Sequence, residues 1–254
     1  MRISVCLYAG VVATGLAVAG LPTTATAEPV PPGGLVTSFL RNQGTYCSII
    51  CPLGAQTANT VVTTVQQAPG TLAAAWQVED PARALGVTAA SITGPTSVAA
   101  QRAIVADGTI VAPRALNAFE VGVVGLMNVG PAAAGGLPAT AAAVETARED
   151  TYAALNAPIV PDPPPLATPH DPVQAAVLGV IDVGSAVAFP AFNTVLTAAV
   201  QAPDAAAQEL AATGDPAQAL AAGADTVTAA KAAADTIIGD AVTNAMDLIA
   251  QANS

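Results

Sequence analysis

Few side chains in this sequence could carry out acid–base, nucleophilic or metal chemistry. The 254 residues include one histidine, which would have to serve as the base of any Ser-His-Asp triad. It is His170, and it lies in a Pro-rich segment without the rigid scaffold that a catalytic base needs. The sequence contains neither a G-x-S-x-G nucleophile motif nor a G-x-x-x-x-G-K-S/T phosphate loop. We therefore expect a protein that is not an enzyme, with a solvated His170.

Metal and cofactor ligands are equally scarce. Carboxylates are plentiful, but they are spread along the chain, and neighbouring pairs fit helix-end charges or a solvated face. No Asp-rich calcium loop is present, and one histidine cannot build a zinc site. We expect no metal and no cofactor. A turnover activity lost on substitution of Glu120, His170 and Asp182 would contradict the non-enzymatic expectation.

Two cysteines, Cys47 and Cys51, are expected to form a local disulfide. Their four-residue spacing differs from the C-x-x-C redox motif, and pairs of cysteines in an oxidising compartment usually bridge. On a regular helix, side chains four residues apart hold their Cβ atoms about 5–6 Å apart, whereas a disulfide needs about 3.8 Å. We therefore expect the bridge to tighten or end a helix near Pro52.

The N-terminus predicts export. Met1-Arg2 is followed by an apolar run from Ile3 to Leu21 and then by Ala25-Thr26-Ala27, which together describe a secretory signal peptide over residues 1–27. The bias toward Ala, Val, Thr and Pro, with this Ala-Thr-Ala ending, resembles many exported proteins of high-GC, mycolic-acid-bearing actinobacteria. The resemblance covers the whole chain but is compositional, so it implies a secreted or cell-envelope setting and no site residues.

The charge balance narrows the class of partner. The net charge of −11 makes nucleic acid, or an anionic membrane held by charge, a poor partner. We expect the protein to act through its surfaces, by binding an unknown envelope component or by self-association.

The fold is predicted to be all-α, an Ala/Val-rich helical bundle in two parts. The Pro-rich segment 156–172 favours extended geometry and would separate an N-terminal part (28–155) from a C-terminal part (173–254). Asp80-Pro81, Asp171-Pro172 and Asp215-Pro216 each fit a helix start, with Asp as N-cap and Pro as the first helical residue. Strand-like alternation is weak throughout.

The two parts share sequence phrases in the same order. Residues 59–69 match residues 193–203, and residues 80–85 match residues 215–220, at nearly the same offset. Two ordered matches are harder to obtain by chance than one, even in an Ala-rich chain. We therefore predict an old internal duplication.

Two hydrophobic segments, 115–130 and 173–200, allow two different functions. In the first segment, Ala118, Gly122 and Gly125 form a face of small side chains beside a face of larger ones, Phe119, Val123 and Leu126. Small faces let helices approach closely, so we favour burial of these stripes against other helices over membrane insertion. The alternative is a lipid-binding or membrane-inserting protein that uses both segments.

The only tryptophan, Trp76, is expected to anchor the core. It follows Ala73, Ala74 and Ala75, and a large aromatic side chain among small ones is more often packed inside than offered to a ligand.

Overall fold

The computed structural model describes residues 30–159 and 167–253, and these residues form helices and turns without a strand among them. The predicted signal peptide, residues 1–27, lies outside the described residues, as do residues 160–166 of the Pro-rich segment. The predicted all-α bundle is confirmed. Its α-helices are α1 (Gly34–Ala75), α2 (Pro81–Ala106), α3 (Ala112–Ala132), α4 (Leu137–Asn156), α5 (Pro172–Ala186), α6 (Phe192–Thr213) and α7 (Pro216–Ala252).

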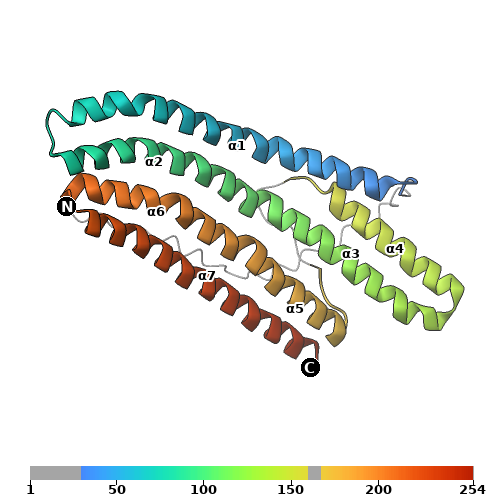
Figure 1. Ribbon diagram of the computed structural model, residues 1–254. Helices are drawn as coiled ribbons and strands as arrows, with labels where there is room; N and C mark the ends of the chain where they lie inside the picture. The colour runs from blue at the N-terminus through green and yellow to red at the C-terminus, as the bar shows by residue number, and fades with distance from the viewer. Residues whose placement is uncertain (1–29, 160–166, 254) are drawn as a thin grey trace.

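The helices lie side by side in a row (Figure 1). Helix α1 packs against α2, α2 packs against α6, and α6 packs against α7. Helix α4 lies beside α3 at the end of the row where α1 begins, and α5 packs against α7. The two predicted parts of the chain therefore pack together, chiefly through α2 and α6.

The three predicted N-caps are confirmed. The carboxylates of Asp80, Asp171 and Asp215 each accept hydrogen bonds from two backbone N–H groups in the first turn of the helix that follows. For Asp171, the two N···O distances are 2.8 Å and 2.9 Å. Because a proline at the first helical position has no N–H to leave unsatisfied, each Asp-Pro pair starts its helix at low cost.

Two wide π-helical turns join four of the helices into two long ones. The turn Asp107–Val111 connects α2 to α3, and the turn Val187–Ala191 connects α5 to α6. Pro113 follows the first turn and Pro190 lies in the second, and each lacks the N–H that a regular α-helix would use there. Asn193, two residues after the second turn, donates from Nδ2 to Asp107 Oδ2 of the first turn at 3.5 Å.

The helices meet along seams of glycine and alanine. A Cβ atom on Gly86 of α2 would lie 2.2 Å from the backbone nitrogen of Ala211 on α6. A Cβ atom on Gly179 of α5 would lie 2.9 Å from the Cβ of Ala245 on α7. The backbones therefore approach so closely at these points that only glycine fits.

Many of the large apolar side chains are exposed, which corrects one expectation. In segments 115–130 and 173–200, Ala118, Val124 and Leu178 are buried. By contrast, Phe119 is 59% exposed and Val180 is 74% exposed. The reason is geometric, because backbones this close have room between them for hydrogen or methyl groups and none for a branched or aromatic side chain. Trp76 is also exposed (52%), at the end of α1, so its predicted core role is wrong.

The predicted disulfide between Cys47 and Cys51 is present, with the two Cα atoms 5.1 Å apart. The helix does not end there, however, since α1 continues through Pro52 to Ala75. Both cysteines are exposed, so the bridge and the proline ring occupy the outer side of the helix, where they displace no neighbouring element.

The matched phrases occupy equivalent places in the two hairpins. Residues 59–69 lie in α1 and residues 193–203 in α6, whereas residues 80–85 begin α2 and residues 215–220 begin α7. Each matched set therefore spans a helix, a turn and the capped start of the next helix. The duplication itself stays a prediction.

Candidate functional site

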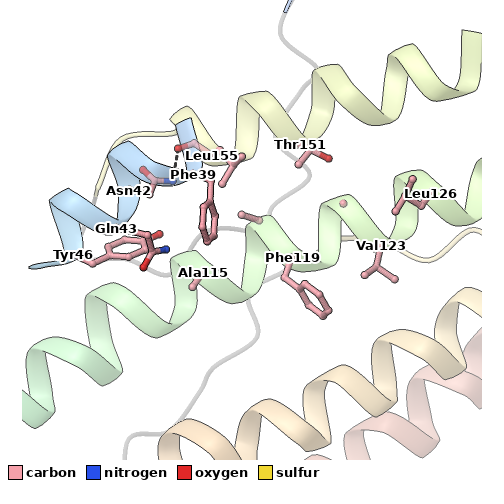
Figure 2. Close-up of a pocket in the computed structure, with 12 residues that line it drawn as sticks. Phe39, Asn42, Gln43, Tyr46, Ala115, Phe119, Val123, Leu126, Thr151 and Leu155 are labelled. Carbon is pink, nitrogen blue, oxygen red and sulfur yellow. Dashed lines mark hydrogen bonds between the residues drawn. The ribbon is translucent and has the colours of Figure 1, made fainter. Parts of the chain in front are cut away.

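An apolar groove of about 330 Å³ lies between the N-terminal half of α1 and the helices α3 and α4 (Figure 2). Its lining combines large apolar side chains, small residues and a few uncharged polar groups, and no charged side chain takes part. We call these residues the apolar groove: Phe39, Asn42, Gln43, Tyr46, Ala115, Ala118, Phe119, Gly122, Val123, Leu126, Thr151 and Leu155.

The floor of the groove exists because α3 presents small residues to α4. A Cβ atom on Gly125 would lie 2.8 Å from the Cβ of Ala147, so the two helices touch at this point. One turn earlier, a Cβ atom on Gly122 would lie 3.6 Å from Thr151 Oγ1, which is ordinary contact distance. A larger side chain at Gly122 would therefore occupy space that the groove now leaves open.

Aromatic and aliphatic side chains form the walls. Figure 2 shows Phe39 pointing from α1 toward α3, where Ala115 and Phe119 lie. Phe39 is 53% exposed and Leu126 is 69% exposed, so the walls are open to a molecule arriving from outside. The groove is therefore apolar and accessible at the same time.

The polar groups of the groove are nearly all occupied by the protein itself. Asn42 Nδ2 donates to the carbonyl oxygen of Leu155 at 2.7 Å, and Thr151 Oγ1 donates to the carbonyl oxygen of Ala147 at 2.7 Å. The pKa of Tyr46 is raised because its phenol is buried, and the neighbouring Arg114 guanidinium opposes that rise.

Polar clamps hold the three helices in place around the groove. Arg114 donates to the carbonyl oxygens of Leu155 (2.8 Å) and Pro158 (3.0 Å), which are left without helical partners at the end of α4. On the other side, Asn156 Nδ2 donates to Ser38 Oγ at 2.8 Å and joins α4 to α1. These bonds fix the groove without placing a charge inside it.

Beside the groove, α3 and α5 bring two carboxyl groups together. Glu120 is 1% exposed, and no hydrogen bond of ordinary geometry reaches its carboxyl oxygens from the described residues, although the Asp182 carboxyl and the Ala167 backbone lie next to it. Burial, and then the nearby Asp182 carboxyl, raise the pKa of Glu120 to about 7. The pKa of Asp182 is also raised, mainly by burial. Two carboxyl groups placed like this retain a proton near neutral pH.

The structure does not bring His170 into that pair. His170 is exposed as predicted, and its backbone N–H donates to Gln174 Oε1 at 2.9 Å. Within residues 30–159 and 167–253, no group of three or more His, Cys, Asp or Glu side chains is placed to hold a metal ion. The Glu120–Asp182 pair can therefore hold a proton, but His170 is not placed to exchange that proton with it.

Sequence reasoning found half of the groove. It selected the small and large faces of α3 that form the floor and one wall, but it assigned them to helix packing. It missed Phe39, Gln43 and Tyr46, which lie on α1, at least 69 residues before the first α3 residue of the groove, Ala115. No local pattern marks these residues as a site, because they become one only when α1 lies across α3.

Two continuous helical stretches, Pro81–Gly135 and Pro172–Thr213, are long and apolar enough to cross a membrane, with mean hydropathies of 1.4 and 1.8 in their most apolar windows. Only 39% and 28% of those windows are buried. Length and composition are the whole basis of this finding, and core helices of soluble proteins also meet the criterion.

No protein-family model, no curated protein and no solved structure matches this chain, so the groove and its surroundings are the grounds on which a function can be argued.

Proposed function

We propose that this chain is an exported, non-enzymatic binding protein whose apolar groove holds the acyl chain of an uncharged lipid. The observation that carries the proposal is the groove itself, an accessible apolar depression over a glycine and alanine floor. Its volume of about 330 Å³ stands at the lower end of the range for small-molecule sites, which suits one narrow chain.

The occupied polar groups favour an acyl chain over a peptide. A peptide would bring backbone N–H and C=O groups into a groove where Asn42 and Thr151 already bond to the protein. Each polar group buried without a partner costs about 1–3 kcal/mol. An acyl chain brings no such groups, so its apolar surface is buried without that cost.

The absence of charge in the lining favours an uncharged headgroup. An anionic headgroup would find no cationic side chain in the groove, and the chain as a whole carries a net charge of −11. Gln43 is the exposed amide of the lining, and no hydrogen bond to it is made within the described part of the chain. Its amide is therefore available to a hydroxyl or ester group.

Two further parts of the proposal have separate support. Export is supported by the N-terminal pattern of residues 1–27 and by the Cys47–Cys51 disulfide, because such bonds persist in oxidising compartments. A non-enzymatic role is supported by the lining of the groove, which includes no His, Cys, Ser or carboxylate side chain.

Binding of the uncharged fluorescent probe N-phenylnaphthylamine tests the proposal. We expect the intact protein to enhance the fluorescence of the probe, and a monoacylglycerol to displace it where an apolar tripeptide does not. The Gly122→Leu variant should weaken binding by about tenfold or more, because the new side chain fills the groove from its floor.

The matched control is Gly184→Leu, the same change on α5 at a position where a Cβ atom meets nothing within 4 Å. It should bind the probe as the wild type does. Equal binding by the Gly122→Leu variant, or displacement by the tripeptide alone, would overturn the proposal. Probe binding that decreases as protein concentration rises would indicate that a second copy fills the groove instead.

A further inference from the structure

The turn between α3 and α4 lies within a stretch that carries no charged side chain. Every residue from Val121 to Val144 is uncharged, and we call this stretch the hairpin tip. It comprises the C-terminal part of α3, the turn at Gly136 and the first two turns of α4. Figure 1 shows this turn projecting at one end of the molecule.

The hairpin tip also holds the most exposed large apolar side chain in the described part of the protein. Leu137, the first residue of α4, is 86% exposed, and Leu126 on the opposite arm is 69% exposed. An exposed apolar end that lacks charge is expected at a site of contact with an apolar partner.

We propose that the hairpin tip inserts into an electrically neutral lipid surface, from which the apolar groove takes up its acyl chain. A chain with a net charge of −11 is repelled by anionic lipid, so it approaches a membrane most easily with an end that has no charge of its own. The hairpin tip is such an end.

The charges on α4 limit how deeply the tip enters. Glu145 and Arg148 form an ion pair with a 3.3 Å N···O distance, and both belong in water. At 1.5 Å per residue, the arm from Leu137 to Val144 is about 12 Å long, close to the depth of about 5–10 Å reached by interfacial helices. The backbone of the turn at Gly136 is not fully hydrogen-bonded within a helix, so entry into the hydrocarbon centre would be costly.

The hairpin tip is continuous with the groove. Gly122, Val123 and Leu126 belong to both, so the groove runs along α3 toward the part of α3 that meets the lipid. This inference rests on the proposed function only for the identity of the ligand, an acyl chain bound in the apolar groove. Docking of the tip and binding in the groove are separate steps, and they can fail separately.

A tryptophan placed in the tip reports its insertion directly. In a Trp76→Phe background, we expect the emission of the Leu137→Trp variant to shift to the blue with phosphatidylcholine vesicles, and brominated acyl chains to quench it. The wild-type protein is the built-in comparison, since Trp76 lies at the α1–α2 turn and should show neither change. A Leu137→Trp emission that vesicles leave unchanged, or quenching of Trp76 instead, would overturn the inference.

A matched pair of charge insertions tests the same surface without a probe. Leu137→Asp should reduce flotation with phosphatidylcholine vesicles by about tenfold, because a carboxylate would enter the interface. Val78→Asp, at an 80% exposed position of the α1–α2 turn, should float as the wild type does. Equal flotation of the two variants would refute docking through the tip. So would a Leu137→Asp variant whose main defect is loss of self-association in sedimentation without lipid.

The groove variant separates the two proposals. Phe39→Gln, on α1 and outside the hairpin tip, should lose probe binding and still float, because it puts a polar group in the wall of the groove and leaves Leu137 in place. If it floats and binds the probe, the groove proposal fails and the tip proposal stands. If the wild type binds the probe and does not float, the tip proposal fails and the groove proposal stands.

Discussion

At the scale of single residues, most of the buried apolar side chains are small, and the largest fully buried side chains are polar. The largest fully buried side chains are Gln174, Glu120 and Ser38, whereas many Val, Leu and Phe side chains are exposed. Gln174 has a partner, since its Nε2 donates to Asn128 Oδ1 at 2.5 Å. Glu120 is buried beside the Asp182 carboxyl and has no cationic partner among the described residues, so it is most stable in the neutral form, as its raised pKa of about 7 indicates.

The pKa of Glu120 predicts how stability changes with pH. Because this pKa is raised from 4.5 to about 7 in the folded protein, the folded state binds more protons than the unfolded state between those values. The contribution of Glu120 is therefore most favourable below about pH 4.5 and is lost as pH rises through 7. At 1.36 kcal/mol per pKa unit, the loss amounts to about 3 kcal/mol.

Replacing Glu120 with its neutral isostere should remove this loss. In chemical denaturation, Glu120→Gln should unfold with nearly the wild-type free energy at pH 5 and with a larger one at pH 8. Asp182 keeps part of the pH dependence, since its own pKa is raised by burial. The control is Glu79→Gln, at an exposed carboxylate after α1, which should follow the wild type at both values. If the free energy of unfolding of Glu120→Gln changed with pH as much as that of the wild type, the Glu120 carboxyl would not be desolvated.

At the scale of the elements, stability depends on how closely the helices approach. Gly86 marks the closest contact, because its missing Cβ atom would lie within 2.7 Å of three backbone atoms of α6. Backbone atoms cannot move aside as a flexible side chain can. By contrast, Gly44 on α1 has nothing within 4 Å of the same position.

Alanine at these two glycines should therefore have opposite effects. Gly86→Ala should lower the free energy of unfolding by about 3 kcal/mol or more, since α2 and α6 must separate. Gly44→Ala should raise it by about 0.5–1 kcal/mol through helix propensity. Urea denaturation of both variants measures the difference. A Gly86→Ala variant that is as stable as the wild type or more stable would show that the α2–α6 seam is looser than described, whereas a destabilised Gly44→Ala variant would contradict the open space at Gly44.

The same comparison shows what sequence could and could not predict. The helices and their Asp-Pro starts depend on signals within a few residues, and Asp80, Asp171 and Asp215 were identified from sequence alone. Whether a large apolar face is buried or exposed depends on the distance between the backbones of neighbouring helices. No local sequence pattern determines that distance. The small and large faces of α3 were therefore recognised from sequence. The large face was expected to be buried against other helices, whereas Phe119 and Leu126 are exposed and line the groove. The residues that α1 contributes to the groove were missed.

At the scale of the whole molecule, the row of helices leaves much apolar surface in water. The helices contact their neighbours along narrow seams, and side chains such as Val36, Leu40 and Val98 remain more than half exposed. Folding therefore removes less apolar area from water per residue than a layered core does.

This architecture predicts a small heat-capacity change on unfolding. Typical proteins show about 12–15 cal/mol/K per residue, and we expect a clearly lower value here because the change follows the apolar area that unfolding exposes. Calorimetry over a range of pH gives this quantity, at concentrations where sedimentation shows a monomer. A value within or above the typical range would mean that the exposed faces are covered in solution, by a second copy or by a rearrangement.

The wide turn at Asp107–Val111 has a consequence for the groove, whose α3 residues follow it on the same continuous helix. A regular helix advances by about 100° with each residue, so one residue more or fewer in this turn would rotate all of α3 about its own axis. Ala118 and Gly122 would then face away from α4, and the depression would close although every residue lining it was unchanged. The angular setting of the apolar groove is thus decided outside the groove, in a stretch of chain that a comparison of lining residues would overlook.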